Sequence, residues 1–180
     1  MTMPRPKMES LPAPSASESL GNFYQDRNDN PKPGSTYLIL HEPSNLALTL
    51  VWGQLTLQKI PIMFEEGNPL EGNCSWHWKC NEHNGWFEFR NKTSGSCITL
   101  KHEYSSNIPQ QPLCVRVEGD SEQGPEALQQ CGYIMKFQKG SELVQARLEP
   151  PVEGWKEGCE AKMTWEYGKE GTVWRFVKVA

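Results

Sequence analysis

The chain has 180 residues, of which 37% are hydrophobic and 22% charged, and its formal net charge is -4 at pH 7. This size and composition are typical of one globular domain with some unfolded polar sequence attached. The mild acidity argues against a basic surface of the kind that binds nucleic acid or an anionic membrane, so we expect neither partner.

Residues 1–33 are rich in proline and serine and hold few large apolar side chains. Because such a segment buries too little apolar surface to offset its ordering entropy, we expect a disordered tail and one folded domain over residues 34–180. The first residues hold no apolar run typical of a secretory signal, and no segment has the ~20 apolar residues of a membrane span. We therefore expect a cytoplasmic protein whose six cysteines are reduced thiols.

From Gly34 onward, short runs of alternating apolar and polar residues are separated by turn residues. Period-two alternation of β-branched and aromatic residues predicts half-buried strands, and no amphipathic helix is evident. The alternating apolar positions are, in chain order, Tyr37 and Ile39; Leu46, Leu48 and Leu50; Leu55 and Leu57; Trp76, Trp78 and Cys80; Phe87 and Phe89; Ile98 and Leu100; Leu113, Val115 and Val117; Tyr133, Met135 and Phe137; Val144, Ala146 and Leu148; Met163, Trp165 and Tyr167; and Trp174 and Phe176.

These runs repeat along the chain. A shift of 50 residues places Tyr37 on Phe87 and Leu48 on Ile98, and a further shift of 46 places Ile98 on Val144. Three units of about 48 residues therefore fill the domain, each with four short strands, although residues 103–111 show no clear strand. Three such units must close on one another to bury their inner faces. We predict an all-β protein, a β-trefoil of about twelve strands.

Two stretches, Gly34–Leu40 and Gly85–Gly95, resemble the repeat openings of ricin-B-like β-trefoils. The second stretch and the ending Val173–Val179 are also similar to small β-trefoil proteins of filamentous fungi that have no assigned function. Sugar-binding ricin-type units place an aspartate in the second strand, and the matching positions here are Thr49, Thr99 and Gln145. The resemblance thus implies the fold but lacks the sugar-orienting carboxylate.

Three of the seven tryptophans lie near turns or repeat edges and are candidate ligand-binding residues: Trp52, Trp86 and Trp155. Large aromatic side chains at turns can stack on sugars or anchor a protein partner. The alternative is that each covers a mouth of the barrel or packs on its own hairpin. By contrast, Trp76, Trp78 and Trp174 occupy strand positions that we expect in the core.

Other chemistry has weaker support. Cys74, His77, Cys80 and His83 have the spacing of zinc ligands, but strand geometry points His77 away from the two cysteines. Cys97 and His102 share one stretch without the signature of a nucleophile elbow. We expect no catalytic site, no metal and no cofactor.

The repeats are interrupted by acidic, Pro- and Gly-rich loops at residues 61–73, 118–131 and 150–158. Because loops on a rigid scaffold often carry binding function, we expect a non-enzymatic, monomeric protein-interaction module that acts through them. Two alternatives stay open. One is a divergent carbohydrate-binding module that uses the three candidate tryptophans, and the other is a loop-mediated protease inhibitor.

Overall fold

The computed structural model describes residues 2, 28–60, 74–100, 112–119 and 132–179. These residues form eleven β-strands and one 3-10 turn, η3, so the expectation of an all-β fold is confirmed. The elements are β1 (Thr36–His41), β2 (Leu46–Val51), β3 (Gln54–Gln58), η3 (Cys74–Trp76), β4 (Trp78–His83), β5 (Trp86–Asn91), β6 (Arg116–Gly119), β7 (Tyr133–Lys139), β8 (Glu142–Gln145), β9 (Arg147–Leu148), β10 (Met163–Thr164) and β11 (Val173–Lys178). The stretch 103–111, in which no strand was evident, lies outside the described residues.

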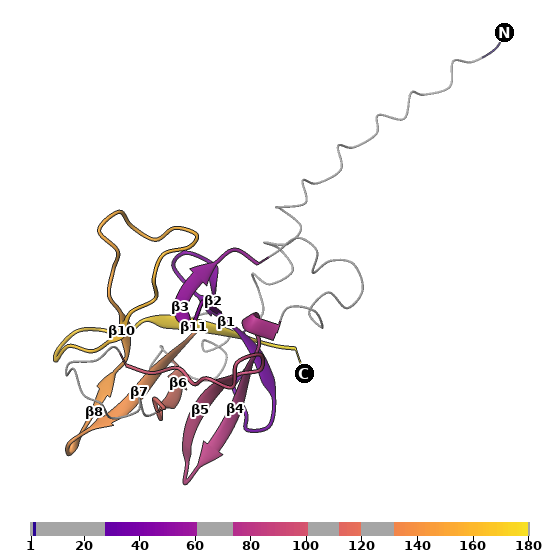
Figure 1. The fold of residues 1–180 in the computed structure, drawn as a ribbon. Helices are drawn as coiled ribbons and strands as arrows, with labels where there is room; N and C mark the ends of the chain where they lie inside the picture. Colours follow the sequence, from indigo (N-terminus) through magenta and orange to yellow (C-terminus); the bar gives the residue numbers. More distant parts are fainter. Residues whose placement is uncertain (1, 3–27, 61–73, 101–111, 120–131, 180) are drawn as a thin grey trace.

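Six strands pair into a closed ring. β1 pairs with β11 on one side and with β4 on the other, β4 pairs with β5, and β7 pairs with both β6 and β11. The ring closes between β5 and β6 because Phe87 and Val115 exchange two backbone hydrogen bonds of 2.8 Å. Figure 1 shows the β4–β5 and β7–β8 hairpins on one side of the molecule and β3 on the other.

Further pairs of segments add to the same core. β2 pairs with β3, β9 pairs with β10, and the Leu113 amide donates a hydrogen bond to the Ile98 carbonyl. Leu57, Ile98 and Met163, one from each pair, are buried in the cluster that fills the ring. Burial of their apolar surface is the main force that holds the three pairs against the ring.

Both faces of β1 are buried, although the alternation predicts burial of one face only. Tyr37 and Ile39 point into the main core, as expected. Leu38 and Leu40 form a second cluster with residues from other segments, among them Trp76. Trp76 is therefore buried, as predicted, but it belongs to η3 and covers the outer face of β1. Trp78 and Trp174 lie in the main core, as expected.

Backbone hydrogen bonds define how the repeated segments correspond. The Ile98 amide donates to the Phe89 carbonyl of β5, and the Ala146 amide donates to the Met135 carbonyl of β7. Extending the β1–β2 register by one residue places Leu48 opposite Ile39 in the same way. The predicted match of Ile98 with Val144 is therefore wrong by two residues. The cause is the β7–β8 hairpin, which has four residue pairs, whereas β1 and β2 have two.

The segment before Gly34 contacts the folded region. The Asp29 amide donates to the Phe176 carbonyl at 2.7 Å, and an Asp29 carboxylate oxygen accepts from the Lys178 amide at 2.8 Å. The Lys32 amide donates to the Tyr37 hydroxyl at 2.8 Å. Most of the expected tail lies outside the described residues. Within the part that the structure describes, no helix has the length and apolarity needed to cross a membrane.

Candidate functional site

The structure does not bring the three candidate tryptophans together. Trp86 pairs with His83 at the turn of the β4–β5 hairpin. This turn lies beyond Thr36, the residue at which β1 begins, because Thr36 pairs with Lys79 of β4. Trp155 contacts His41, the last residue of β1. Because β1 separates these positions, Trp86 and Trp155 lie at opposite ends of the paired strands. The two rings cannot form one stacking platform.

Trp52 occupies the tip of the β2–β3 hairpin. Trp52 and Gly53 both have positive φ, 53° and 76°, as a two-residue turn of the I′ type requires. The Trp52 side chain is 99% exposed. Of the three candidates, Trp52 is thus the one whose ring is fully presented to solvent.

The other two candidates are partly covered. The Arg116 guanidinium lies 4.6 Å from the centre of the Trp86 ring, a cation–π contact that covers one face of the indole. The Trp155 ring centre lies 4.4 Å from that of His41, which is also 5.7 Å from Trp174. Trp155 therefore closes the edge of the core, which is the structural role left open by the sequence.

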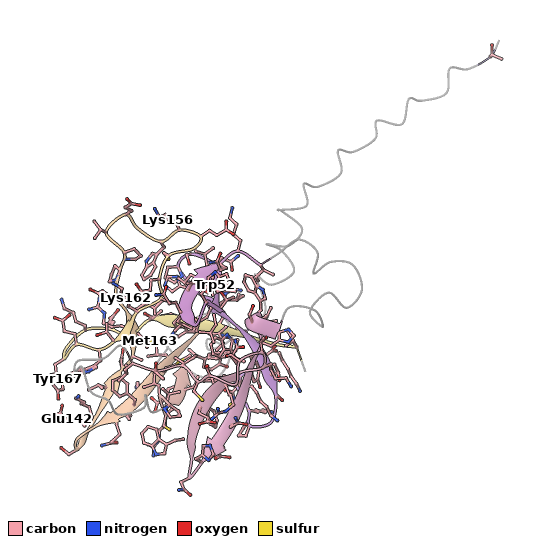
Figure 2. All side chains as sticks on the ribbon, viewed as in Figure 1. Trp52, Glu142, Lys156, Lys162, Met163 and Tyr167 are labelled. Atoms are coloured by element: carbon pink, nitrogen blue, oxygen red, sulfur yellow. The ribbon has the colours of Figure 1, made fainter. Side chains whose placement is uncertain are left out.

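A hollow that the sequence did not indicate lies between β8 and residues 166–170. Its volume is about 510 Å³. Its lining combines one aromatic ring with acidic, basic and amide side chains: Glu142, Gln145, Glu166, Tyr167, Lys169 and Glu170. Tyr167 is 59% exposed, and Figure 2 shows Tyr167 and Glu142 at the same edge of the molecule. We call this site the Tyr167 hollow.

The Tyr167 hollow is held by close contacts beneath it. The Gly171 amide donates to Gln145 Oε1 at 2.6 Å, and a Cβ at Gly171 would lie only 2.9 Å from the Ala146 carbonyl oxygen. The Tyr167 ring meets Trp165 edge-on, with 4.7 Å between ring centres. The Lys139 ammonium lies 4.8 Å from the centre of the Trp165 ring. These contacts support Tyr167 from below while its ring stays accessible, so the site is largely preformed.

Sequence reasoning misplaced Tyr167. The alternation of Met163, Trp165 and Tyr167 predicts a strand with three inward side chains, but β10 ends at Thr164. Gly168, with φ of 74°, then turns the chain and leaves Tyr167 at the surface. The nearby glycines at 168 and 171 were the one sequence signal for this turn.

The corrected register changes one of the positions that match the lectin aspartate. Thr49 and Thr99 follow Leu48 and Ile98, so the residue that follows Ala146 is Arg147, and the assignment of Gln145 is wrong. Thr49 is fully buried, and its hydroxyl lies 3.2 Å from that of Thr56. Arg147 forms an ion pair of 3.0 Å with Glu166. None of the three positions supplies a carboxylate, but Glu166 brings one beside Arg147 from the facing segment.

The residues with zinc-ligand spacing lie in different surroundings. Cys80 is buried in the main core, where burial raises the pKa of its thiol to about 12. His83, on the same strand, is largely exposed and lies 3.6 Å from Glu88. Throughout the described ranges, no three His, Cys, Asp or Glu side chains gather as metal ligands would. Of the nucleophile candidates, Cys97 is partly buried, whereas His102 lies outside the described residues.

The predicted binding loops are only partly described. Residues 61–73 and 120–131 lie outside the described residues. In the loop at 150–158, Val152 is fully exposed while Trp155 packs on the core. This loop therefore has an anchored side and a solvent side.

No protein-family model matches the chain, and no curated protein sequence matches it. A solved structure with a similar fold is that of the ricin B-like lectin from Macrolepiota procera in complex with lactose. The two chains are 13% identical, the alignment covers 82% of this chain and 98% of the lectin, and the TM-score is 0.53. At this identity the likeness concerns the fold, and it supports the ricin-B-like fold that the repeat openings implied.

Proposed function

We propose that this protein is a non-enzymatic carbohydrate-binding protein and that the Tyr167 hollow is its sugar site. The observation that carries the proposal is a solvent-facing tyrosine, supported by Trp165, at the edge of a hollow with carboxylate, ammonium and amide groups. Small-ligand sites combine aromatic side chains with a few placed polar groups that fix the orientation of the ligand, and this hollow offers both. The likeness of the fold to a lectin crystallised with lactose agrees with this function.

The chemistry of the hollow suits a pyranose. One face of a pyranose ring presents C–H groups, which pack on an aromatic ring such as that of Tyr167. The sugar hydroxyls would donate hydrogen bonds to the carboxylates of Glu142 and Glu170. They would accept hydrogen bonds from the Lys169 ammonium and from Gln145 Nε2, because Gln145 Oε1 already accepts from the Gly171 amide.

Charge should decide which sugars bind. The lining has three carboxylates, from Glu142, Glu166 and Glu170, but one ammonium, from Lys169. Arg147, which pairs with Glu166, reduces this excess of negative charge without removing it. Like charges close together repel, so sialylated and uronic-acid glycans should bind more weakly than neutral ones.

Several finer features belong to this proposal. We propose that the domain consists of three units of about 48 residues with about twelve strands, and that it is related to small fungal β-trefoils. We also propose that it acts in the cytoplasm. Binding of a protein through the loops, which the sequence favoured, and inhibition of a protease are the competing functions.

Isothermal titration calorimetry with neutral mono- and disaccharides, lactose included, tests the proposal on the full chain. Tyr167→Ala should weaken binding at least tenfold, about 1.4 kcal/mol, because the stacking surface is lost. Tyr167→Phe is the matched control, since it keeps the ring and removes the hydroxyl, and it should bind within a few-fold of the wild type. Tyr167 is largely exposed, so both variants should keep the melting temperature of the wild type.

A glycan array then extends the search to larger and charged sugars. Neutral glycans bound by the wild type and lost in Tyr167→Ala would support the proposal. Absence of binding to every glycan would refute it, as would equal binding by the wild type and Tyr167→Ala.

A further inference from the structure

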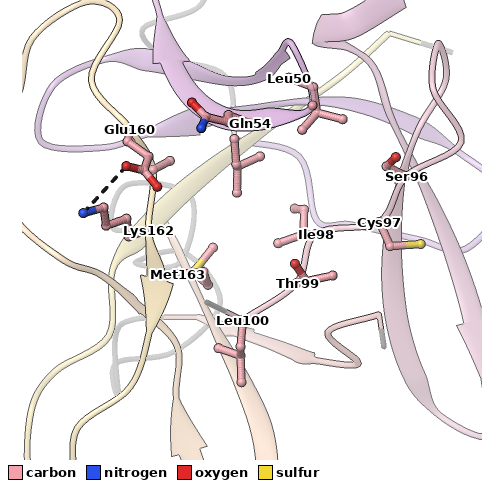
Figure 3. Close-up of a pocket in the computed structure, with 13 residues that line it drawn as sticks. Leu50, Gln54, Ser96, Cys97, Ile98, Thr99, Leu100, Glu160, Lys162 and Met163 are labelled. Atoms are coloured by element: carbon pink, nitrogen blue, oxygen red, sulfur yellow. Dashed lines mark ion pairs between the residues drawn. The ribbon is translucent and has the colours of Figure 1, made fainter. Parts of the chain in front are cut away.

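A second hollow lies where the β2–β3 hairpin, residues 96–100 and residues 160–163 meet. Its volume is about 420 Å³. Figure 3 shows that Leu50, Ile98 and Met163 turn their side chains toward this space, and Leu55 and Leu100 complete its aliphatic lining. We call it the Leu55 hollow.

The rim of the Leu55 hollow is polar and carries both signs of charge. Lys162 and Glu160 form an ion pair of 3.6 Å on one side of the opening, as Figure 3 shows. Gln54, Ser96 and Thr99 supply neutral polar groups. An apolar interior with a balanced polar rim suits an uncharged, flat apolar group better than an ion.

Such a group stands at the edge of the same hollow. Trp52 is the neighbour of Gly53, which lines the hollow, yet its side chain is 99% exposed. Its φ of 53° is also unusual, since a bulky residue at positive φ is an outlier and asparagine is preferred at this place in a I′ turn. A residue that is both strained and fully exposed at a hairpin tip indicates a binding role outside its own chain.

We propose that two copies of this chain associate by exchanging these groups, so that Trp52 of each copy occupies the Leu55 hollow of the other. A two-fold dimer requires a self-complementary surface, and here the projecting indole and the apolar hollow lie side by side on one hairpin. The charged rim is compatible with such a dimer, because a two-fold axis can place Glu160 of each copy opposite Lys162 of the other.

The expected contact is small. Each inserted indole buries about 150–250 Å² of its own surface, so two insertions and the walls they cover bury roughly 800 Å². Stable complexes bury about 1,200–2,000 Å². The dimer should therefore be weak and should dissociate on dilution to the monomer that the sequence led us to expect.

Sedimentation velocity of the full chain from about 1 μM to about 1 mM tests the proposal, since weak complexes dissociate in this range. The wild type should change from monomer to dimer, with a blue shift of tryptophan fluorescence as the indoles leave water. Trp52→Ala should weaken the dimer at least tenfold. Leu100→Glu, which places a charge in the hollow, should do the same, whereas Tyr167→Ala, an aromatic residue of the other hollow, should have no effect.

A mixture of the two weakening variants distinguishes reciprocal insertion from other contacts. Trp52→Ala keeps an intact hollow and Leu100→Glu keeps an intact Trp52, so the mixture should form a heterodimer with one insertion, more readily than either variant alone associates. A wild type that stays monomeric throughout the range would overturn the proposal and leave a peptide or small molecule as the occupant. Dimerisation that survives Trp52→Ala would also overturn it.

Discussion

Acid should destabilise this protein through His41. The imidazole is 1% exposed, packs against Trp155 and Trp174, and has its Nδ1 2.6 Å from the Ser44 hydroxyl oxygen. Burial disfavours the charged imidazolium and lowers the pKa of His41 from 6.5 to about 4. The folded state therefore holds this group neutral over a pH range in which the unfolded chain would protonate it.

The sign and size of the effect follow from that difference. Between pH 6.5 and about 4 the unfolded state binds more protons than the folded state, so the free energy of unfolding falls as the pH falls. The difference of about 2.5 pH units corresponds to roughly 3 kcal/mol at 1.36 kcal/mol per unit. The full contribution is present above pH 6.5 and is lost as the pH falls through this window to below 4.

Urea unfolding of the wild type and His41→Phe, each at pH 7 and below pH 4, measures this contribution. Phenylalanine keeps the aromatic contacts with Trp155 and Trp174, and both proteins share every other titrating group. The wild type should lose roughly 3 kcal/mol more than the variant on acidification. Equal losses would refute the reasoning. So would an NMR titration of His41 in the folded wild type with a midpoint near 6.5, and this measurement is independent of the variant's stability.

Two further predictions concern backbone strain and thiol reactivity. Gly132→Ala should destabilise the protein by roughly 3 kcal/mol, because φ is 84° and a Cβ would lie 2.6 Å from Val173 Cγ1. Gly168→Ala, with φ of 74° and open space around it, should cost about 1 kcal/mol; urea unfolding of both variants measures the two costs, and equal costs would contradict the predicted clash. The pKa of Cys80 is raised to about 12 by burial, so iodoacetamide at pH 8 should modify exposed Cys114 in the native protein and leave Cys80 unmodified until urea is added. Mass spectrometry of the two peptides checks this order, and early modification of Cys80 would show that its thiol is accessible.

The local pattern was enough to predict strands and much of the core. Tyr37, Ile39 and Phe89 alternate with polar or outward residues, and burial of Trp78 and Trp174 followed from their strand positions. The equivalence of the first two repeated segments also survived, since Leu48 and Ile98 occupy matching places in the hydrogen-bond register. These features depend on the two-residue period of a strand, which the order of residues encodes directly.

Features that depend on how separate segments meet could not be obtained in this way. Burial of Leu38 and Leu40 requires Trp76 to cover the outer face of β1, and the place of Ala146 depends on the number of pairs in the β7–β8 hairpin. The apolar pattern predicts on which face of a strand a side chain lies. It does not predict which segment packs on that face or how many residue pairs a hairpin contains.

The candidate sites show the same division. The sequence by itself identified Trp52, Trp86 and Trp155 as aromatic residues near turns, which is a local property. Only the tertiary structure showed that Trp155 packs on His41, that Arg116 covers Trp86, and that Trp52 alone of the three is fully exposed. It also assembled the Tyr167 hollow and the Leu55 hollow from segments far apart in the chain. Each hollow forms only when these segments pack against one another, so the tertiary structure determines where it lies and which residues line it.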